Sequence, residues 1–216
     1  MTSGLSLVLV RHGETEWMER GRLHGRLDSP LSPTGRRHAE QAAQRLHRER
    51  FDALYTSPLG RAMETAAILG RSVGLAPQPI EGLAELDFGW LEGTPAVLWH
   101  SDGLTGAALR PVRALAFALT AERPAAFRQR VTQALEWIVA HHPSGRLLVV
   151  AHHAVLSRLL GVMMAAPENA WRDYGPLTAC GISEVRRLAH GANGRESGWE
   201  IVVLNDVSHL RPEETR

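Results

Sequence analysis

Short aliphatic stretches, each followed by a helical pattern, recur through most of this sequence. Leu5–Val10, Phe51–Thr56 and Arg146–Ala151 have the length and aliphatic content of buried strands. Residues 181–188 and 199–204 have the same character near the end of the chain. Parallel strands need a long crossover connection, which is usually a helix, so the alternation predicts an α/β fold. We expect three α/β/α layers, with a mainly parallel central sheet and helices on both of its faces.

Turn and capping residues indicate where the helices begin. Ser32–Pro33 is typical of an N-cap followed by the first helical residue, and small apolar residues then recur on one helix face. Ser57–Pro58 repeats this signal and predicts a second helix, with Arg61 in its first turn. Amphipathic patterns predict further helices over residues 125–142 and about 154–165.

Residues 90–122 lack a clean hydrophobic period. We interpret them as an irregular insertion with short helices that covers a site, within a single domain that spans residues 1–216. The insertion is mostly apolar, and Arg110 and Arg113 are its only Lys or Arg residues.

The composition argues against several classes of function. The chain has 216 residues, 44% of them hydrophobic and 22% charged, as in an ordinary soluble globular protein. Its 24 basic and 23 acidic residues leave a net charge of +1, which gives no basis for binding nucleic acid or an anionic membrane. The only cysteine, Cys180, excludes an internal disulfide and fits a reducing compartment. The N-terminal apolar run is too short for a signal sequence, so we expect a cytoplasmic protein. The sequence leaves the oligomeric state open.

Residues that can bind and react with an oxyanion stand where predicted strands end or helices begin. Arg11 and His12 follow the first strand, and His152 follows a later one. Ligands of open α/β sheets gather at such carboxyl ends of strands. Arg61 lies at a helix N-terminus, which attracts anions, and Glu85 lies in a turn-rich segment. This set includes a nucleophile, cationic donors and a proton donor, which are the groups that phosphoryl transfer without a metal needs.

A catalytic metal is the alternative for a chain with 11 histidines. The sequence has no His-x-x-x-His pair with a helical carboxylate and no cysteine cluster. Neighbouring side chains diverge, so the pairs His141–His142 and His152–His153 are poorly arranged to chelate one ion. We therefore predict no metal, and we interpret His141–His142 as structural, at a helix end.

Several motifs, in order and at the usual spacings, resemble those of the histidine phosphatase superfamily, in its phosphoglycerate-mutase-like branch. The first is the Arg-His-Gly signature within Leu9–Thr15. The others are Asp28–Leu31, Tyr55–Ala66, Glu85 with Glu92–Gly93, Leu148–His152 and Asn205–Leu210. The last of these resembles the broad-specificity phosphatases of the family, and the resemblance covers nearly the whole chain.

The resemblance implies a role for each of the five candidate residues. His12 would be the nucleophile and form a transient phosphohistidine. Arg11, Arg61 and His152 would hold the phosphoryl oxygens and lower the pKa of His12. Glu85 matches the proton donor of the family, and burial would raise its pKa. The resemblance implies no metal and no organic cofactor.

Three further positions are expected to contact the substrate. His24 and Gly25 fall where mutases of this family place a substrate-contacting Ser-Gly or Thr-Gly pair. His153 replaces the glycine that usually follows the second catalytic histidine, where a positive φ or a close approach of substrate would favour glycine. Met18 stands where the family usually has an Asn that hydrogen bonds on the phosphate side.

Three functions remain open from the sequence. The leading interpretation is hydrolysis of a small-molecule phosphomonoester, because mutases of the family carry a longer insertion with basic and Tyr residues that grip a second phosphate. The second is a bisphosphate-primed phosphoglycerate mutase. The third is an inactive phosphate-binding or interaction module, which the presence of both His12 and Glu85 opposes. A specialised phosphatase of a cobalamin-pathway nucleotide also fits the pattern.

Overall fold

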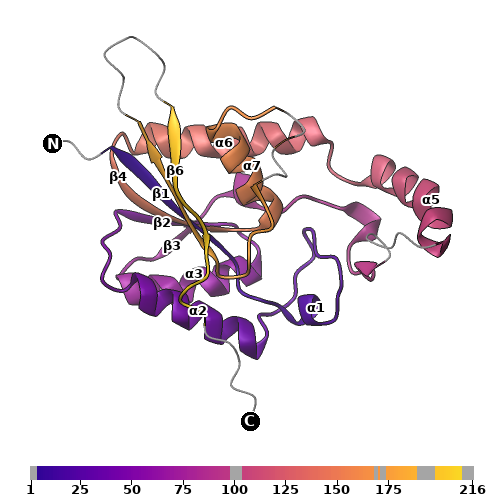
Figure 1. Ribbon diagram of the computed structural model, residues 1–216, viewed down its shortest axis with the longest axis horizontal. Helices are drawn as coiled ribbons and strands as arrows, with labels where there is room; N and C mark the ends of the chain where they lie inside the picture. The colour runs from indigo at the N-terminus through magenta and orange to yellow at the C-terminus, as the bar shows by residue number, and fades with distance from the viewer. Residues whose placement is uncertain (1–3, 98–103, 168–169, 171–173, 189–197, 211–216) are drawn as a thin grey trace.

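A six-stranded sheet forms the centre of the molecule, with strands in the order β3-β2-β4-β1-β5-β6 (Figure 1). The computed structural model describes residues 4–97, 104–167, 170, 174–188 and 198–210. The strands are β1 (Leu5–Arg11), β2 (Ala53–Thr56), β3 (Pro77–Pro79), β4 (Gly145–Ala151), β5 (Ile182–Arg187) and β6 (Trp199–Asp206). The first four pair in parallel, whereas β5 and β6 pair antiparallel at one edge. The predicted mainly parallel sheet is therefore confirmed.

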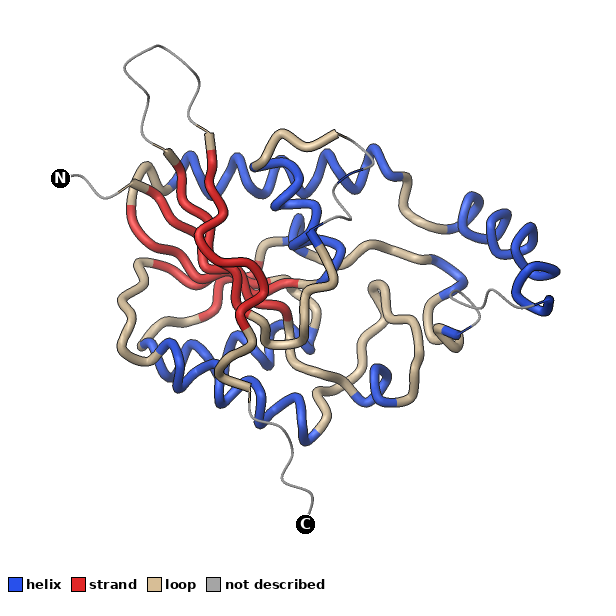
Figure 2. The backbone as a smooth tube through the Cα atoms, viewed as in Figure 1, coloured by secondary structure: helices blue, strands red, loops and turns tan. Residues whose placement is uncertain are grey.

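Helices pack on both faces of the sheet (Figure 2). They are α2 (Pro33–Leu46) and α3 (Gly60–Val73) on one face, and α6 (Pro124–His141) and α7 (His153–Met163) on the other. In β1, Leu5, Leu7 and Leu9 are buried in the core beneath α6 and α7, whereas Val8 and Val10 are buried beneath α2 and α3. Burial on both faces explains why this strand is a continuous aliphatic run, and it confirms the three-layer prediction.

The register of the sheet brings three functional segments to one edge. Arg11 of β1 is paired with Ala151 of β4, and the His12 N–H donates to the Ala151 carbonyl at 2.9 Å. The Ser57 N–H donates to the Val150 carbonyl at 3.0 Å. The chain therefore leaves β1, β2 and β4 side by side at the carboxyl edge, where ligands of such sheets bind.

One of the two predicted helix caps is confirmed and the other is wrong. Ser32 is the N-cap of α2, and its hydroxyl accepts from the Gly35 N–H at 3.0 Å. The N-cap of α3 is Leu59 rather than Ser57, and α3 has no side-chain cap. The Ser57 hydroxyl instead accepts from the Leu59 N–H at 3.2 Å and contacts a histidine described below. Arg61 nevertheless lies in the first turn of α3, as predicted.

The insertion over residues 90–122 is more regular than the sequence suggested. It contains α5 (Leu104–Thr120), a helix of 17 residues, although residues 98–103 lie outside the described part. The helix is rich in Leu and Ala, which are strong helix formers, and it continues through Pro111. The helix lies beside η2 (Gly89–Leu91) at one end of the molecule, away from the sheet (Figure 1). It leaves Val112, Leu115 and Leu119 exposed.

The remaining short elements lie near the carboxyl edge of the sheet or in its connections. They are α1 (Glu16–Glu19) and η1 (Glu81–Leu83). Of the helices in the described ranges, none has the length and apolar character needed to cross a membrane.

Candidate active site

His12 lies directly after β1 and is buried, with 4% of its surface exposed. Its Nδ1 is 2.7 Å from the Gly13 carbonyl, which can only accept, so Nδ1 carries the proton and Nε2 is left as the basic nitrogen. Burial lowers the pKa of His12 well below its ordinary 6.5, and the positive charges of Arg11 and Arg61 lower it further. The structure thus holds a neutral imidazole with a basic Nε2, which is the form that a nucleophile needs.

His152 follows β4, and its ring centroid is 5.0 Å from that of His12. Its Nε2 is 2.6 Å from the hydroxyl of Ser57. Because this hydroxyl already accepts from the Leu59 N–H, its own proton is available for Nε2, and Nδ1 of His152 would then carry a proton. Nδ1 is buried and has no hydrogen-bond partner in the described part of the chain. In that tautomer, His152 offers the N–H of Nδ1 as a donor; burial and the charge of Arg61 lower its pKa, so the ring is neutral.

The guanidinium of Arg61 is fully buried and is anchored by backbone and carboxylate oxygens. Its Nη1 donates to Asp28 Oδ1 at 2.9 Å and to the Leu27 carbonyl at 3.1 Å. Its Nη2 donates to the Gly25 carbonyl at 2.7 Å. The Nε of Arg61, although buried, has no partner among the described residues. The chain thus fixes this charge in place and leaves Nε without a partner among the described residues.

Arg11 is likewise held through its terminal nitrogens, while its Nε has no partner in the described part of the chain. Its Nη1 donates to the Leu177 carbonyl at 2.7 Å, and its Nη2 lies 3.8 Å from Sδ of Met18. Its buried Nε has no partner within the described ranges. Met18, the departure from the family pattern, therefore contacts a site arginine through a thioether, which is a weak acceptor.

Glu85 is buried, with 8% of its surface exposed, just beyond η1. One carboxyl oxygen accepts from the Leu86 N–H at 2.9 Å, and the other lies 3.3 Å from the Ala154 N–H in the first turn of α7. Burial raises the pKa of Glu85 above its ordinary 4.5, against the opposing effects of these hydrogen bonds and of Arg61 and Arg11. The environment therefore favours a protonated carboxyl group at a pH where an exposed one is ionised.

His24 and Gly25 lie next to this cluster. His24 Nε2 is 2.7 Å from the Thr15 hydroxyl, and its ring centroid is 6.5 Å from that of His12. Burial, followed by the charges of Arg61 and Arg11, lowers the pKa of His24 to about 4. Gly25 has a φ of +68°, and a Cβ there would overlap a carboxyl oxygen of Glu92. Glycine is required at this position both for its backbone conformation and for space.

His153 is the first residue of α7, and its φ is not positive. The helix start explains how the chain accommodates a histidine where the family has glycine. Its Nδ1 accepts from the Leu177 N–H at 3.3 Å, and burial lowers its pKa. His153 thus contacts the same loop that anchors Arg11.

Three residues of the family motifs make contacts at the site that the sequence does not predict. Ser57 was assigned to a helix cap, although it contacts His152. Thr65 accepts from the Gly13 N–H at 3.0 Å and donates to the Arg61 carbonyl at 2.7 Å. Glu92 accepts from the N–H groups of Arg26, Leu27 and Phe88. The spacing of Thr65 four residues after Arg61 on one helix face was the only local signal.

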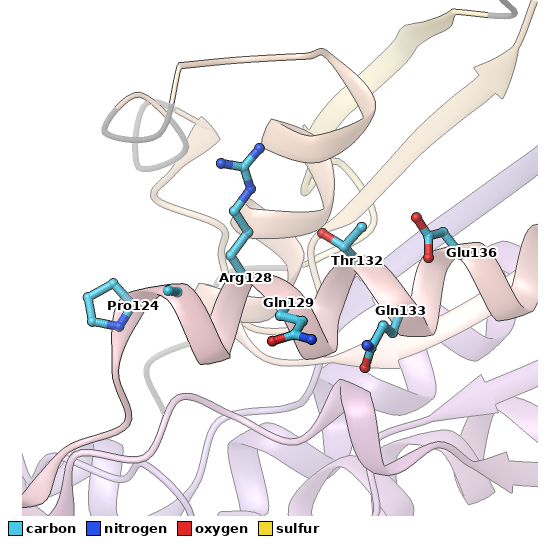
Figure 3. Close-up of a pocket in the computed structure, with 7 residues that line it drawn as sticks. Pro124, Arg128, Gln129, Thr132, Gln133 and Glu136 are labelled. Atoms are coloured by element: carbon cyan, nitrogen blue, oxygen red, sulfur yellow. The ribbon is translucent and has the colours of Figure 1, made fainter.

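Neither of two other features competes with this cluster as the reactive centre. An open pocket of about 610 Å³ lies along the exposed side of α6 (Figure 3), and its lining residues, such as Arg128 and Glu136, include no histidine. Nowhere in the described ranges do three or more His, Cys, Asp or Glu side chains gather as metal ligands could. A reaction without a metal stays a prediction.

Comparison with known proteins gives consistent results. The family model of the histidine phosphatase superfamily (branch 1) matches residues 7–206. "Probable phosphoglycerate mutase GpmB" of Proteus mirabilis is 32% identical over 213 residues, which cover 95% of each chain. "Putative phosphoserine phosphatase 2" of Hydrogenobacter thermophilus is 32% identical over 214 residues, which cover 95% of this chain and 97% of that protein.

A solved structure agrees with these sequence matches. "A putative alpha-ribazole-5'-P phosphatase" from Escherichia coli superposes with a TM-score of 0.78 at 27% identity, covering 94% of this chain and 97% of the other. The order of the motifs, the layers of the fold and the family match over most of the chain all agree. The chain belongs to the histidine phosphatase superfamily (branch 1), a superfamily of phosphatases and mutases.

Proposed function

We propose that this protein hydrolyses small phosphomonoesters through a phosphohistidine on His12. The observation that carries the proposal is a set of three buried nitrogens without partners in the described structure: Nε of Arg11, Nε of Arg61 and Nδ1 of His152. Unpaired buried donors cost about 1–3 kcal/mol each, and an oxyanion bound beside His12 would satisfy them. Their number and charge suit the non-bridging oxygens of a phosphoryl group.

The proposed reaction has two steps. In the first, His12 Nε2 attacks phosphorus, the bond from phosphorus to the leaving oxygen breaks, and Glu85 gives its proton to that oxygen. In the second, water attacks the phosphohistidine, the nitrogen–phosphorus bond breaks, and the Glu85 carboxylate takes the proton of the water. Arg11, Arg61 and His152 hold the phosphoryl oxygens throughout.

The substrate beyond the phosphoryl group is proposed to contact the residues around the cluster. The ring of His24 is next to that of His12, and its lowered pKa keeps it neutral, so it would act as a hydrogen-bonding group rather than a cation. Gly25 allows a close approach of backbone, and His153 begins the helix that follows His152. Together they would border the leaving group.

A phosphoglycerate mutase is the second candidate, favoured by the 32% identity to a protein named as a probable mutase. Hydrolysis is preferred because a relative named as a phosphatase matches 95% of this chain at the same 32% identity, and because residues 90–122 are mostly apolar. An apolar insertion offers little to grip a second phosphate.

The first experiment compares hydrolysis of p-nitrophenyl phosphate by the wild type and by His12→Ala, in the presence of EDTA. We expect turnover by the wild type and a loss of several orders of magnitude in His12→Ala, about 10³-fold or more, because the nucleophile is gone. His47→Ala, a change at an exposed histidine of the α2 C-terminus, is the matched control and should keep full activity.

An inert wild type would contradict the hydrolase proposal. The mutase would then be tested by adding a bisphosphate primer and following transfer of the phosphoryl group to a sugar-acid hydroxyl instead of water. Phosphate binding without any phosphoenzyme would indicate the inactive module.

A further inference from the structure

All five N–H donors of Arg130 in α6 form hydrogen bonds. Three go to backbone carbonyls within residues 82–87, the segment that carries Glu85, and two go to the carboxylate of Glu122. Its Nη1 donates to the carbonyls of Gly82 at 3.0 Å and Ala84 at 2.6 Å, and its Nη2 donates to the carbonyl of Glu85 itself at 2.9 Å. The remaining two donors form a bidentate pair with Glu122, at 2.6 and 2.8 Å. A guanidinium has five donors in a rigid plane, so this set of acceptors fits arginine alone.

Glu122 holds the same segment from its other side. Its N–H donates to the Asp87 carbonyl at 2.9 Å, and a carboxylate oxygen lies 3.5 Å from the Asp87 N–H. The Arg130 and Glu122 side chains are mostly enclosed, with 17% and 12% of their surfaces exposed. A bidentate pair in such surroundings is held more firmly than a surface ion pair. Residues 82–85 are therefore fixed to Arg130 of α6, and Asp87 is fixed to Glu122, which lies just before α6.

Close packing supports this attachment. A Cβ at Gly82 would lie 2.8 Å from the Cβ of Ala134 and 2.9 Å from the Arg130 carbonyl, so η1 lies directly against the backbone of α6. The Arg130 guanidinium is stacked over the buried ring of Phe127, 4.9 Å from its centroid. The segment has little room to shift while this contact is intact.

We propose that Arg130, held by Glu122, is a positioning residue that aims the Glu85 carboxyl at the leaving oxygen. The inference rests on the proposed function, in which Glu85 is the proton donor. Arg130 contacts only the backbone of the segment, so its effect reaches the reaction through the placement of Glu85. A displacement of about 1 Å can cost about 100-fold in rate, so the loss of these hydrogen bonds should weaken proton transfer specifically.

The test compares two substrates of nearly the same shape that differ in their need for a proton. The leaving group of p-nitrophenyl phosphate departs as a stable anion, whereas that of p-nitrobenzyl phosphate is an alkoxide that needs protonation. The measured quantity is kcat/KM, which reports the first chemical step. Glu85→Gln sets the reference, and it should lose activity mainly towards p-nitrobenzyl phosphate, by about 10²–10⁴-fold.

Arg130→Gln should follow the same pattern, with a loss of about 10- to 100-fold towards p-nitrobenzyl phosphate and a much smaller loss towards p-nitrophenyl phosphate. Arg130→Lys should not restore the activity, because its ammonium has three donors and no planar fork. Glu122→Gln, which conserves side-chain volume, should shift the ratio of the two substrates in the same direction. Arg128→Gln, at an exposed arginine of the same helix, is the matched control and should leave the ratio unchanged.

The outcomes separate this inference from the proposed function. An equal loss towards both substrates, or no loss, in folded Arg130→Gln and Glu122→Gln would assign the pair a purely structural role and overturn the inference. If Glu85→Gln itself shows no leaving-group preference, the assignment of the proton donor fails and the inference falls with it. Thermal unfolding of each variant shows which proteins are folded.

Discussion

Burial in the same enclosed site shifts the pKa values of His12 and Glu85 in opposite directions. Burial lowers the pKa of His12 below its ordinary 6.5, so His12 stays neutral and nucleophilic at mildly acidic pH. Burial raises the pKa of Glu85 above its ordinary 4.5, so Glu85 keeps its proton to a higher pH. Activity that needs a neutral His12 and a protonated Glu85 is lost below the lowered pKa of His12 and above the raised pKa of Glu85.

A pH profile tests this pair of shifts. We expect kcat/KM for p-nitrobenzyl phosphate to persist below pH 6.5, because His12 remains unprotonated there, and to fall as the pH rises through the raised pKa of Glu85. The ratio of p-nitrobenzyl to p-nitrophenyl phosphate isolates Glu85 once the ionisation of each substrate's phosphate, titrated separately, is divided out. A ratio that is flat across pH in the wild type would contradict the role of Glu85.

The sequence identified residues whose position depends on local pattern and missed those whose role depends on distant contacts. Arg11, His12 and His152 were predicted because a strand end can be seen in the sequence itself. Ser57 was assigned to the wrong feature, because its partner lies 95 residues away along the chain. The same holds for Arg130, whose acceptors lie 45–48 residues before it in the segment that carries Glu85.

Among the elements, five of the six strands and the helices that pack on them were predicted well because their burial imposes a pattern; the short edge strand β3, which is not buried, was missed. The helix α5 was not predicted as one long helix; it packs on η2, and Val112, Leu115 and Leu119 are exposed, so burial imposes less pattern on it. The segment between α1 and α2 has almost no regular structure, and its shape is set by glycines and by Glu92. Its sequence gives no sign of the contact between Gly25 and Glu92.

This segment offers a matched pair of glycine substitutions. Gly21 and Gly25 have positive φ angles of +60° and +68°, but a Cβ at Gly21 has nothing within 4 Å, whereas one at Gly25 meets Glu92. Gly21→Ala should lose about 1 kcal/mol of unfolding free energy from backbone strain alone. Gly25→Ala should lose more unfolding free energy than Gly21→Ala. It should also lower kcat/KM, because the carbonyl of residue 25 accepts from Arg61.

Denaturant unfolding and p-nitrophenyl phosphate kinetics measure both effects. The difference between the two variants is the cost of displacing Glu92 and the backbone around Arg61. Equal stability and equal activity of Gly21→Ala and Gly25→Ala would show that the contact between Gly25 and Glu92 is unimportant.

At the scale of the whole molecule, the fold concentrates positive charge in its interior while its net charge is only +1. Arg11 ends β1 and Arg61 lies in the first turn of α3, so their unpartnered Nε atoms belong to the carboxyl edge of the sheet. Such an arrangement weakens the protein without a ligand, and under the proposed function a bound oxyanion would satisfy these donors. Stability and ligand binding are therefore coupled through the same few nitrogens.

Inorganic phosphate should raise the melting temperature of the wild type. At a concentration about 100 times its Kd, the stabilisation is about 2.7 kcal/mol, which corresponds to a shift of about 5–10 °C for a chain of this size. Arg11→Gln should melt with a much smaller shift, because one cationic donor is lost. His12→Ala should keep most of the shift, since the proposed phosphoryl donors remain.

Sodium chloride at the same ionic strength separates specific binding from screening, because chloride cannot satisfy three directed donors at once. A shift of equal size in chloride, or an undiminished phosphate shift in Arg11→Gln, would show that phosphate acts elsewhere on the protein. If His12→Ala keeps the phosphate-induced rise in melting temperature but loses activity, anion binding and the chemical step belong to different residues of the site. The donors would then bind the anion, and His12 would supply the reaction.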